Sequence, residues 1–341
     1  MRTCIGFDIG RSAVKIIAGS ILTPSVTIEF PSGFSVSSQI SDAASASRAA
    51  LETVKVAGED YFVGETALFH GGVDLNSGFN DGWSNTTCHA ALFLSGLRRL
   101  RDAGVSEIDE SIIVVGLPAR LQQSQSKSYR SVISNYLPRA TIKVVPQPMG
   151  PYFSMLFDRY GGSDCAVDES SWGFVEVGQF TTDFALLMNG RSVERSLDSC
   201  DGMRVAAESL QKLIINSYRL NVSLAQASSL LANPSLKSYG SLIDVSELVK
   251  QSVAPLARMI ADKAGQIFGD HINTLSGVRI AGGGASLVRD AIAQKWSFTP
   301  TGQKISESFV SVLPTPKFAV ADGFFKFAIA HEISRNQLLK V

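Results

Sequence analysis

The chain has 341 residues, of which 45% are hydrophobic and 18% charged, and this composition is typical of a folded α/β protein and not of a disordered chain. Lys and Arg together number 31, as do Asp and Glu, so the overall charge gives no reason to expect direct binding to nucleic acid or to an anionic membrane. The length allows two domains with large cores.

Targeting signals and metal-binding patterns are not apparent in the sequence. The N-terminus lacks the pattern of a signal peptide, and no apolar run approaches the roughly 20 residues that a membrane span needs. The cysteines and histidines are scattered, without the spacing of a zinc site or a disulfide framework. They are Cys4, Cys88, Cys165, Cys200, His70, His89, His271 and His331. We therefore expect a cytoplasmic protein with reduced thiols.

The first predicted element is a β-hairpin. Its first strand ends near Asp8, a turn of Gly10-Arg11-Ser12 follows, and Lys15 lies in the returning strand. A tight turn of this kind presents backbone N–H groups that, together with Lys15, can hold a phosphate chain, while Asp8 can face Mg²⁺. Glycine-containing hairpins with one acid are common, so this motif alone is a weak indication.

Further elements are expected in the first half of the chain. Strands are predicted at 26–30, 112–117 and 142–145, a second hairpin at 54–63, and helices at 89–100, 122–136 and 152–160. Residues 35–47 fit either a mobile segment or a helix, and the glycine- and asparagine-rich stretch 71–85 predicts a loop.

The second half repeats the opening pattern after a composition break at 161–164. A strand at 171–177, a turn at 178–183 and a returning strand at 184–188 suggest duplicated domains, with limits 1–160 and 161–316. Asp201-Gly202 predicts the cap of a helix through Tyr218. Helices are also expected at 224–231, 245–268, from Leu287 onward and at 316–331, and a strand at 278–281. We expect the C-terminal helix, 317–341, to pack on the first domain with its phenylalanines in the core.

Three segments share one local form, a hydrophobic strand followed by glycine with hydroxyl or acidic side chains. They are 8–15, 176–183 and 280–286. Glycine lets the backbone approach a ligand, and a helix N-terminus favours anions. Each segment alone also fits an ordinary turn. The acid-to-lysine spacing in the first nevertheless equals the acid-to-acid spacing in the second, which is expected of two phosphate-binding hairpins that face each other.

These segments carry a family resemblance. Segments 8–12, 175–183 and 280–284 resemble the phosphate-1, phosphate-2 and adenosine motifs of the superfamily of actin, sugar kinases and heat-shock chaperones. Within it, the chain looks most similar to actin-like ATPases of the ParM/StbA type, which segregate plasmids. The resemblance implies an α/β fold with two actin-like (ribonuclease H-like) domains. Each would have a mixed sheet with flanking helices, and a nucleotide cleft would lie between them.

The resemblance also implies roles for individual residues. Asp8 and Glu176 would hold the water shell of Mg²⁺, and Gln147 would orient the attacking water. The phosphates of ATP or GTP would be held by Gly10, Arg11, Ser12 and Lys15 from one side and by Gly178, Gln179, Phe180 and Thr181 from the other. The adenosine pocket would be lined by Gly202, Gly282, Gly283 and Gly284.

Two positions depart from the family pattern. The second hairpin usually opens with Asp, whereas this chain has Glu176, which is one methylene longer. Plasmid-segregation relatives usually carry Glu where Gln147 stands, and glutamine can position water but cannot accept its proton. Because phosphoryl transfer depends mainly on positioning and charge neutralisation, we expect a slow ATPase, or GTPase, whose hydrolysis acts as a timer.

The leading functional interpretation is a filament that polymerises with nucleotide and segregates plasmids. Its expected partners are other copies of the chain, head to tail, and a DNA-binding adaptor of the ParR type at a centromere-like site, without direct contact to DNA. One alternative is a sugar or metabolite kinase, although no catalytic acid after Pro148 can be defended. Another is a non-polymerising nucleotide-dependent adaptor in cell division or pilus assembly.

Overall fold

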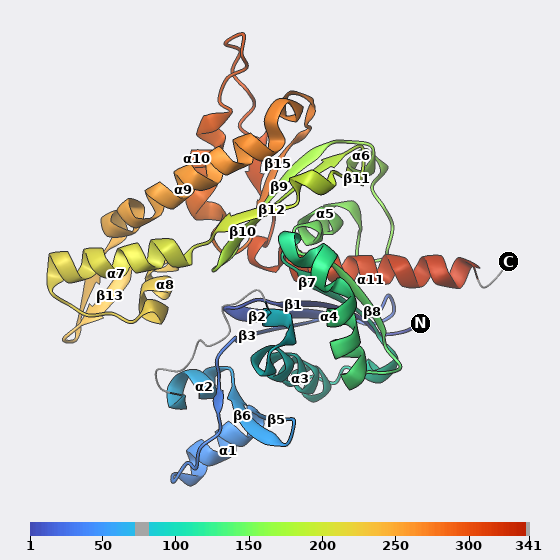
Figure 1. The fold of residues 1–341 in the computed structure, drawn as a ribbon, viewed down its shortest axis with the longest axis vertical. Helices are drawn as coiled ribbons and strands as arrows, with labels where there is room; N and C mark the ends of the chain where they lie inside the picture. Colours follow the sequence, from blue (N-terminus) through green and yellow to red (C-terminus); the bar gives the residue numbers. More distant parts are fainter. Residues whose placement is uncertain (72–81, 339–341) are drawn as a thin grey trace. The chain divides into compact units, whose positions relative to one another are not determined.

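The computed structural model describes residues 1–71 and 82–338, which form two compact units (Figure 1). Unit 1 comprises Met1–Cys165 and Val320–Val341, and unit 2 comprises Ala166–Ala319. Each unit has its own mixed sheet and its own hydrophobic core. Most of the loop expected at 71–85 and residues 339–341 of the expected C-terminal helix lie outside the described residues.

The sheet of unit 1 has the strand order β3-β2-β1-β7-β8. Strands β1 (Cys4–Ile9), β2 (Ala13–Gly19) and β3 (Val26–Pro31) pair antiparallel, and β7 (Ile112–Leu117) and β8 (Thr141–Pro146) continue the sheet in parallel. All six residues of β1 are buried, as a central strand covered on both faces requires.

The sheet of unit 2 repeats this plan in the order β11-β10-β9-β15-β16. Strand β9 (Trp172–Val177) pairs antiparallel with β10 (Thr181–Met188) and parallel with β15 (Gly277–Ala281). The outer strands are β11 (Arg191–Ser192), β12 (Asp198–Asp201) and β16 (Val310–Val312). The repetition inferred from the sequence is therefore confirmed in the sheet topology.

Helices flank both sheets. Unit 1 contains α3 (Thr87–Asp102), α4 (Gln122–Tyr136), α5 (Met149–Leu156) and α11 (Ala319–Leu338, from Val320 onward), and a small subdomain of β4 (Phe34–Val36), β5 (Thr53–Val56), β6 (Glu59–Val63), α1 (Ala43–Leu51) and α2 (Glu65–His70). Unit 2 contains α7 (Arg204–Tyr218), α8 (Leu224–Ala232), α9 (Ser246–Phe268), α10 (Ala285–Lys295) and the hairpin of β13 (Ser235–Ser238) and β14 (Ser241–Asp244). Within the described residues, no helix is long and apolar enough to cross a membrane.

Two expectations about the second hairpin were wrong. The turn does not extend to residue 183, because Thr181 already begins β10, where β-branched side chains are favoured. Asp201 does not cap a helix; it ends β12 and pairs with Thr181. Helix α7 starts at Arg204 after Met203, without a side-chain cap.

The helix expected at 152–160 is shorter and begins earlier. Pro148 occupies the N-cap position, so α5 begins at Met149 and ends at Leu156. Beyond it, the Asp158 carboxylate accepts the N–H groups of Tyr160 and Gly162, at 2.7 and 2.9 Å. A side chain that bonds to the backbone in this way competes with helix formation.

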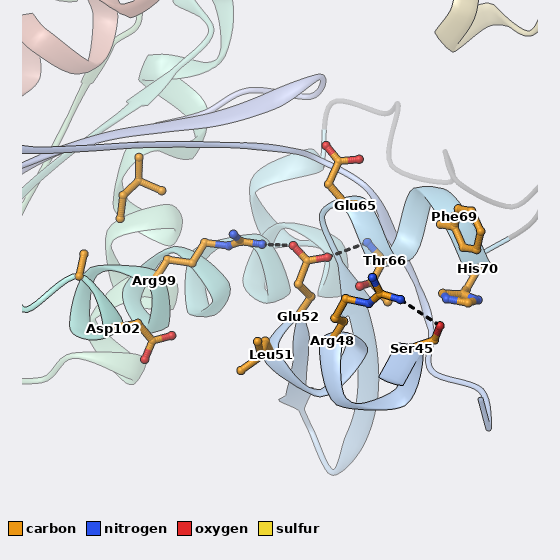
Figure 2. A pocket seen from close by; sticks show the side chains of 12 residues that line it. Ser45, Arg48, Leu51, Glu52, Glu65, Thr66, Phe69, His70, Arg99 and Asp102 are labelled. Carbon is orange, nitrogen blue, oxygen red and sulfur yellow. Dashed lines mark hydrogen bonds and ion pairs between the residues drawn. The ribbon is translucent and has the colours of Figure 1, made fainter. Parts of the chain in front are cut away.

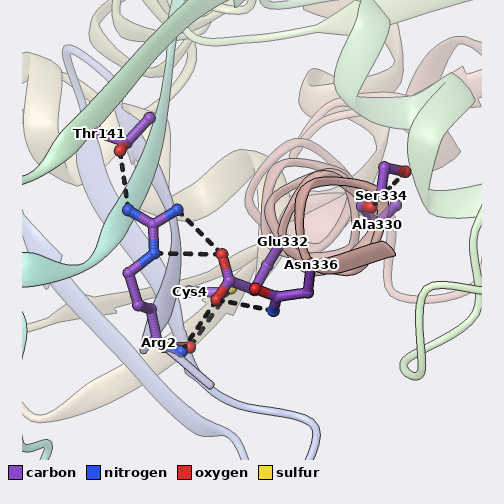
Figure 3. Close-up of polar contacts among 7 residues, drawn as sticks. All are labelled: Arg2, Cys4, Thr141, Ala330, Glu332, Ser334 and Asn336. Atoms are coloured by element: carbon purple, nitrogen blue, oxygen red, sulfur yellow. Dashed lines mark hydrogen bonds and ion pairs between the residues drawn. The ribbon is translucent and has the colours of Figure 1, made fainter. Parts of the chain in front are cut away.

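Helix α11 packs directly against the backbone of unit 1. A Cβ atom at Gly6 would lie 2.1 Å from the carbonyl oxygen of Ala321, and one at Gly323 would lie 1.8 Å from that of Gly150. Phe324 and Phe325 are buried, as the sequence predicted. Near its end, Glu332 accepts hydrogen bonds from the Arg2 guanidinium, with a shortest distance of 2.9 Å (Figure 3).

Candidate functional site

The first hairpin brings an acid, a lysine and an amide together. Asp8 and Lys15 are paired across β1 and β2, and Lys15 Nζ lies 3.1 Å from Asp8 Oδ2. From the segment between β8 and α5, Gln147 Nε2 lies 3.4 Å from Asp8 Oδ1. Asp8 is only 5% exposed, so its charge is balanced by a partner held within unit 1.

Gln147 reaches Asp8 because its neighbours leave room for it. Its N–H donates to the carbonyl of Leu117 at 2.8 Å, which holds the backbone beside the end of β7. A Cβ atom at Gly116 would lie 2.7 Å from Gln147 Cγ. Gly116 is therefore the sequence feature that marks a close contact at this end of the 112–117 strand. The sequence alone does not show that the contacting residue is Gln147, because that depends on how the segments pack.

The turn of the first hairpin is held from its own unit. Ser32 Oγ donates to the carbonyl of Gly10 at 2.5 Å, and Ser32 N–H donates to that of Ser12 at 2.9 Å. The Arg11 guanidinium lies 5.8 Å from the centre of the Trp83 ring. Ser32 and Trp83 were not predicted from the sequence, since each is separated from the turn by at least 20 residues.

A buried aromatic group supports Trp83. His89 packs edge-on against the Trp83 ring, with centroids 5.6 Å apart, and its Nε2 lies 3.0 Å from the Tyr129 hydroxyl. Burial lowers the pKa of His89 to about 3, so the ring is neutral at physiological pH. Burial and the nearby Asp8 carboxylate raise the pKa of Tyr129. His89 is thus a hydrogen-bonded core histidine.

The second hairpin has the same register as the first. Glu176 and Asp183 are paired across β9 and β10 just as Asp8 and Lys15 are across β1 and β2. Gly178 N–H donates to the carbonyl of Thr181 at 2.9 Å. Asp183 is fully buried and accepts the Thr181 hydroxyl at 2.8 Å. The second acid of this hairpin is therefore an interior residue that braces the turn.

The turn of the second hairpin folds onto the start of α7. Gly202, Met203 and Arg204 donate their N–H groups to the carbonyls of residues 180, 178 and 179, at 3.0, 3.0 and 2.7 Å. A Cβ atom at Gly202 would lie 2.6 Å from the Gly178 carbonyl, so only glycine permits this approach. The Gln179 side chain is held by Ser228 at 2.9 Å. Gly202 is thereby brought to the predicted phosphate turn.

The glycine triplet joins the same group of residues. Gly282 has a φ of +89°, and a Cβ there would lie 2.7 Å from Glu176 Oε1. Gly284 N–H donates to the Val177 carbonyl at 3.1 Å. Gly283 has no atom within 4 Å of a Cβ position, so its surface is open. The N-terminal ends of α7 and α10 therefore both lie beside the Glu176 hairpin, where partial positive charge favours an anion.

Each hairpin, taken by itself, carries groups whose chemistry suits a nucleotide with Mg²⁺. Within residues 1–71 and 82–338, no group of three or more His, Cys, Asp and Glu side chains could hold a metal by itself. Mg²⁺ needs no such group, because it keeps several waters and is bound through one or two carboxylates together with phosphates. Asp8 and Glu176 have the required donor chemistry, and the glycine turns leave the backbone accessible.

A separate pocket of about 840 Å³ lies between the small subdomain of unit 1 and α3, where α1 and α2 also line it (Figure 2). Glu52 lies in its wall, where its carboxylate accepts the Thr66 N–H at 2.6 Å and pairs with Arg99. Burial acts to raise the pKa of Glu52, but these two bonds outweigh it and hold the pKa below its usual value. No residue of the predicted site lines this pocket.

The duplicated sheets with equivalent glycine hairpins define a two-domain protein of actin-like architecture. Residues 6–150 match the family model of the N-terminal domain of actin-like proteins, and residues 174–294 match that of the C-terminal domain of archaeal actin homologues described as MreB-like. The chain therefore belongs to the actin-like superfamily, as predicted, and its fold class is confirmed. No curated protein matches the sequence significantly.

Solved structures share this fold at low sequence identity. ParM in a 15-stranded filament from Clostridium botulinum is 20% identical, with a TM-score of 0.70 over 96% of this chain and 99% of that one. MamK in a double helical filament is 17% identical, with a TM-score of 0.71 over 96% and 99%. The archaeal actin homologue Ta0583 in complex with ADP is 17% identical, with a TM-score of 0.66 over 95% and 98%.

Proposed function

We propose that this protein binds ATP or GTP with Mg²⁺, assembles head to tail into filaments and hydrolyses the nucleotide slowly. The observation that carries this proposal is the equivalence of the two hairpins. Each presents an acid at the end of its first strand and a glycine two residues later. The glycine triplet beside Glu176 adds an open surface suited to a nucleoside.

The proposed roles follow from chemistry already described. Bound Mg²⁺ would neutralise charge on the β- and γ-phosphates. Asp8 and Glu176 would hold its water shell, while Lys15 and the two turns would hold phosphate oxygens. Gln147, which is already oriented toward Asp8, would position the attacking water without accepting its proton. Slow hydrolysis is the expected result.

Self-assembly is supported by the relatives. ParM and MamK are described as filaments, and Ta0583 was solved with ADP. A contact between two different surfaces of the same chain repeats without closing and produces an open helical polymer. We extend the proposal to plasmid segregation in the cytoplasm, with a DNA-binding adaptor of the ParR type that connects the filament to a centromere-like site.

Calorimetry and light scattering test the nucleotide-dependent part. Mg-ATP or Mg-GTP should bind with one site per chain and should raise light scattering and the pelleted fraction, whereas ADP should not sustain assembly. A non-hydrolysable analogue should give filaments that persist. If calorimetry detects no binding heat with either nucleotide, and a fluorescent nucleotide analogue also gives no binding signal, the proposal is wrong.

Plasmid retention tests the segregation part. A low-copy plasmid that carries the gene with its flanking DNA should be retained over many generations, and the Asp8→Ala variant should lose it at the rate expected from random partition. Equal retention by both would contradict a segregation role while leaving filament assembly intact.

A further inference from the structure

Trp83 lies shortly before α3, and its backbone is held by the N-terminal cap of that helix. Its carbonyl accepts the hydroxyl and the N–H of Thr86, at 2.8 and 3.2 Å, and the same hydroxyl accepts the N–H of His89 at 3.2 Å. The next residue, Ser84, is buried and donates its hydroxyl to the Gln125 side chain of α4 at 3.0 Å. Trp83 is therefore anchored to both α3 and α4.

The Trp83 ring is fixed in place as well. The residue is only 8% exposed, and His89 packs edge-on against it while the imidazole is bonded to the Tyr129 hydroxyl. The indole N–H is buried and has no hydrogen-bond partner among residues 1–71 and 82–338. A phenylalanine would avoid this unsatisfied donor, which costs free energy when it is buried. What the indole offers to these residues is therefore its ring face.

Arg11 is the residue that lies over this ring face. Its guanidinium carbon is 5.8 Å from the centre of the Trp83 ring, within the range in which an aromatic face attracts a cation. This attraction is strongest for tryptophan among the aromatic side chains. Because a guanidinium carries five N–H donors, an arginine that contacts a ring can still donate to phosphate oxygens.

The backbone around Arg11 is held separately from its side chain. Ser32 donates its hydroxyl to the carbonyl of Gly10 and its N–H to the carbonyl of Ser12. These bonds fix the turn but do not restrict the long arginine side chain. Arginine loses much rotamer freedom when it is ordered, so a contact that orders it before a ligand arrives lowers the entropic cost of binding.

We propose that Trp83 is a positioning residue of the nucleotide site, whose ring holds the Arg11 guanidinium ready to contact the terminal phosphate of a nucleoside triphosphate. The assignment rests on the proposed function. It adds a residue that does not itself contact the ligand, and it gives Arg11 the role of distinguishing a triphosphate from a diphosphate. A triphosphate carries the additional charge, and Arg11 supplies a positive charge at this turn besides that of Lys15, which is paired with Asp8.

Paired substitutions test this role in the full chain. Trp83→Leu keeps an apolar side chain without an aromatic face, so it should weaken Mg-triphosphate binding about fivefold and Mg-ADP binding less than about twofold. Arg11→Gln should give at least the same selective loss. Adding Trp83→Leu to Arg11→Gln should then have no further effect, because Trp83 acts through Arg11. Trp83→Phe retains a ring face and should recover most of the affinity. Calorimetry with Mg-ATP, Mg-GTP and Mg-ADP measures these affinities.

Tryptophan fluorescence provides a readout that a purely structural role of Trp83 would not produce. Binding of Mg-triphosphate should change the emission as the guanidinium turns toward phosphate, and Arg11→Gln should abolish this change without any substitution at Trp83. The other two tryptophans of the chain, Trp172 and Trp296, lie in unit 2. Trp172→Phe and Trp296→Phe serve as controls, and each should retain the part of the change that depends on Arg11.

The outcomes separate this assignment from the proposed function. Equal losses of triphosphate and diphosphate binding in Trp83→Leu, or additive losses in the double variant, would show that Trp83 only supports packing. An emission change that persists in full in Arg11→Gln would also overturn the assignment, and this comparison decides the question if Trp83→Leu does not fold. Failure of the unmodified chain to bind any nucleotide would instead remove the proposed function.

Discussion

At the scale of single residues, the two hairpins place different residues opposite their first acid. In the first, the buried Asp8 is paired with Lys15, so the site is electrically balanced before any ligand binds. In the second, Glu176 faces Asp183, which is buried and bonded to the Thr181 hydroxyl. We therefore expect Lys15 to leave Asp8 and to bind phosphate when the proposed Mg-nucleotide binds.

Asp8→Ala should abolish assembly that depends on nucleotide, because the metal loses its carboxylate and Lys15 loses its partner. Asp8→Asn keeps the shape and a hydrogen-bonding oxygen, so it should remain folded while Mg-nucleotide affinity falls at least tenfold. Calorimetry with Mg-ATP and Mg-GTP measures the affinity, and circular dichroism checks folding. Normal assembly by either variant would remove the metal role of Asp8.

Gln147→Ala should retain nucleotide binding and filaments but release phosphate at least tenfold more slowly. The reason is that its amide would no longer orient water, whereas its removal leaves the Asp8–Lys15 pair intact. Phosphate release in a single turnover gives the rate, and Gln122→Ala, on α4, is a control for loss of a glutamine elsewhere in unit 1. An unchanged rate would mean that other groups position the water.

At the scale of elements, α11 joins the C-terminal part of the chain to the first strand. Where α11 contacts β1 and α5, neither Gly6 of β1 nor Gly323 of α11 has room for a side chain. Arg2 and Glu332 form an ion pair near the C-terminal end of α11 (Figure 3). Burial acts to raise the pKa of Glu332, but the hydrogen bonds from Arg2 outweigh it and hold the pKa below its usual value.

This pair should make the stability of unit 1 depend on pH. A carboxylate whose pKa is lower in the folded state stabilises fully above its unfolded pKa of about 4.3, and that contribution is lost as pH falls through the folded pKa. Glu332→Gln should cost about 2 kcal/mol at pH 7 and should flatten the loss of stability on acidification below about pH 5.

Urea unfolding across this pH range measures the effect. Asp60→Asn provides the control, because the Asp60–Lys55 pair is 3.8 Å long and both side chains are at least half exposed. That control should leave stability and its pH dependence nearly unchanged. An equal pH profile for Glu332→Gln and the unmodified protein would show that the Arg2 contact does not contribute.

At the scale of the whole molecule, the duplicated topology places equivalent turns in two units of separate sequence. Binding of the proposed nucleotide should stabilise the folded chain. At a nucleotide concentration of 100 times Kd, the expected stabilisation is about 2.7 kcal/mol.

Removal of the metal tests whether this stabilisation by nucleotide depends on Mg²⁺. With Mg-nucleotide present, excess EDTA should lower the melting temperature to that of the free chain and reverse light scattering. Glu176→Gln should weaken the response to Mg²⁺ while unit 2 stays folded. A melting temperature that rises with nucleotide but is indifferent to EDTA would show that binding does not require the metal.

The sequence by itself determined the central strands of both sheets, the glycine turns and the duplicated order of these elements. These features depend on local spacing: apolar runs form the central strands, and glycine ends them where the backbone must turn. The paired register of Asp8 with Lys15 followed from the same local spacing, whereas Asp183, expected in the turn, proved to lie in β10 opposite Glu176.

Only the tertiary structure decided which distant residues meet. Gln147 reaches Asp8 from 139 positions away, the turn at Gly178 folds onto Gly202, and Ser32 holds the first turn. The same holds for the extent of β10. Such contacts depend on how the sheets, helices and loops pack, and the chain encodes that packing through many side chains acting together rather than through any local pattern.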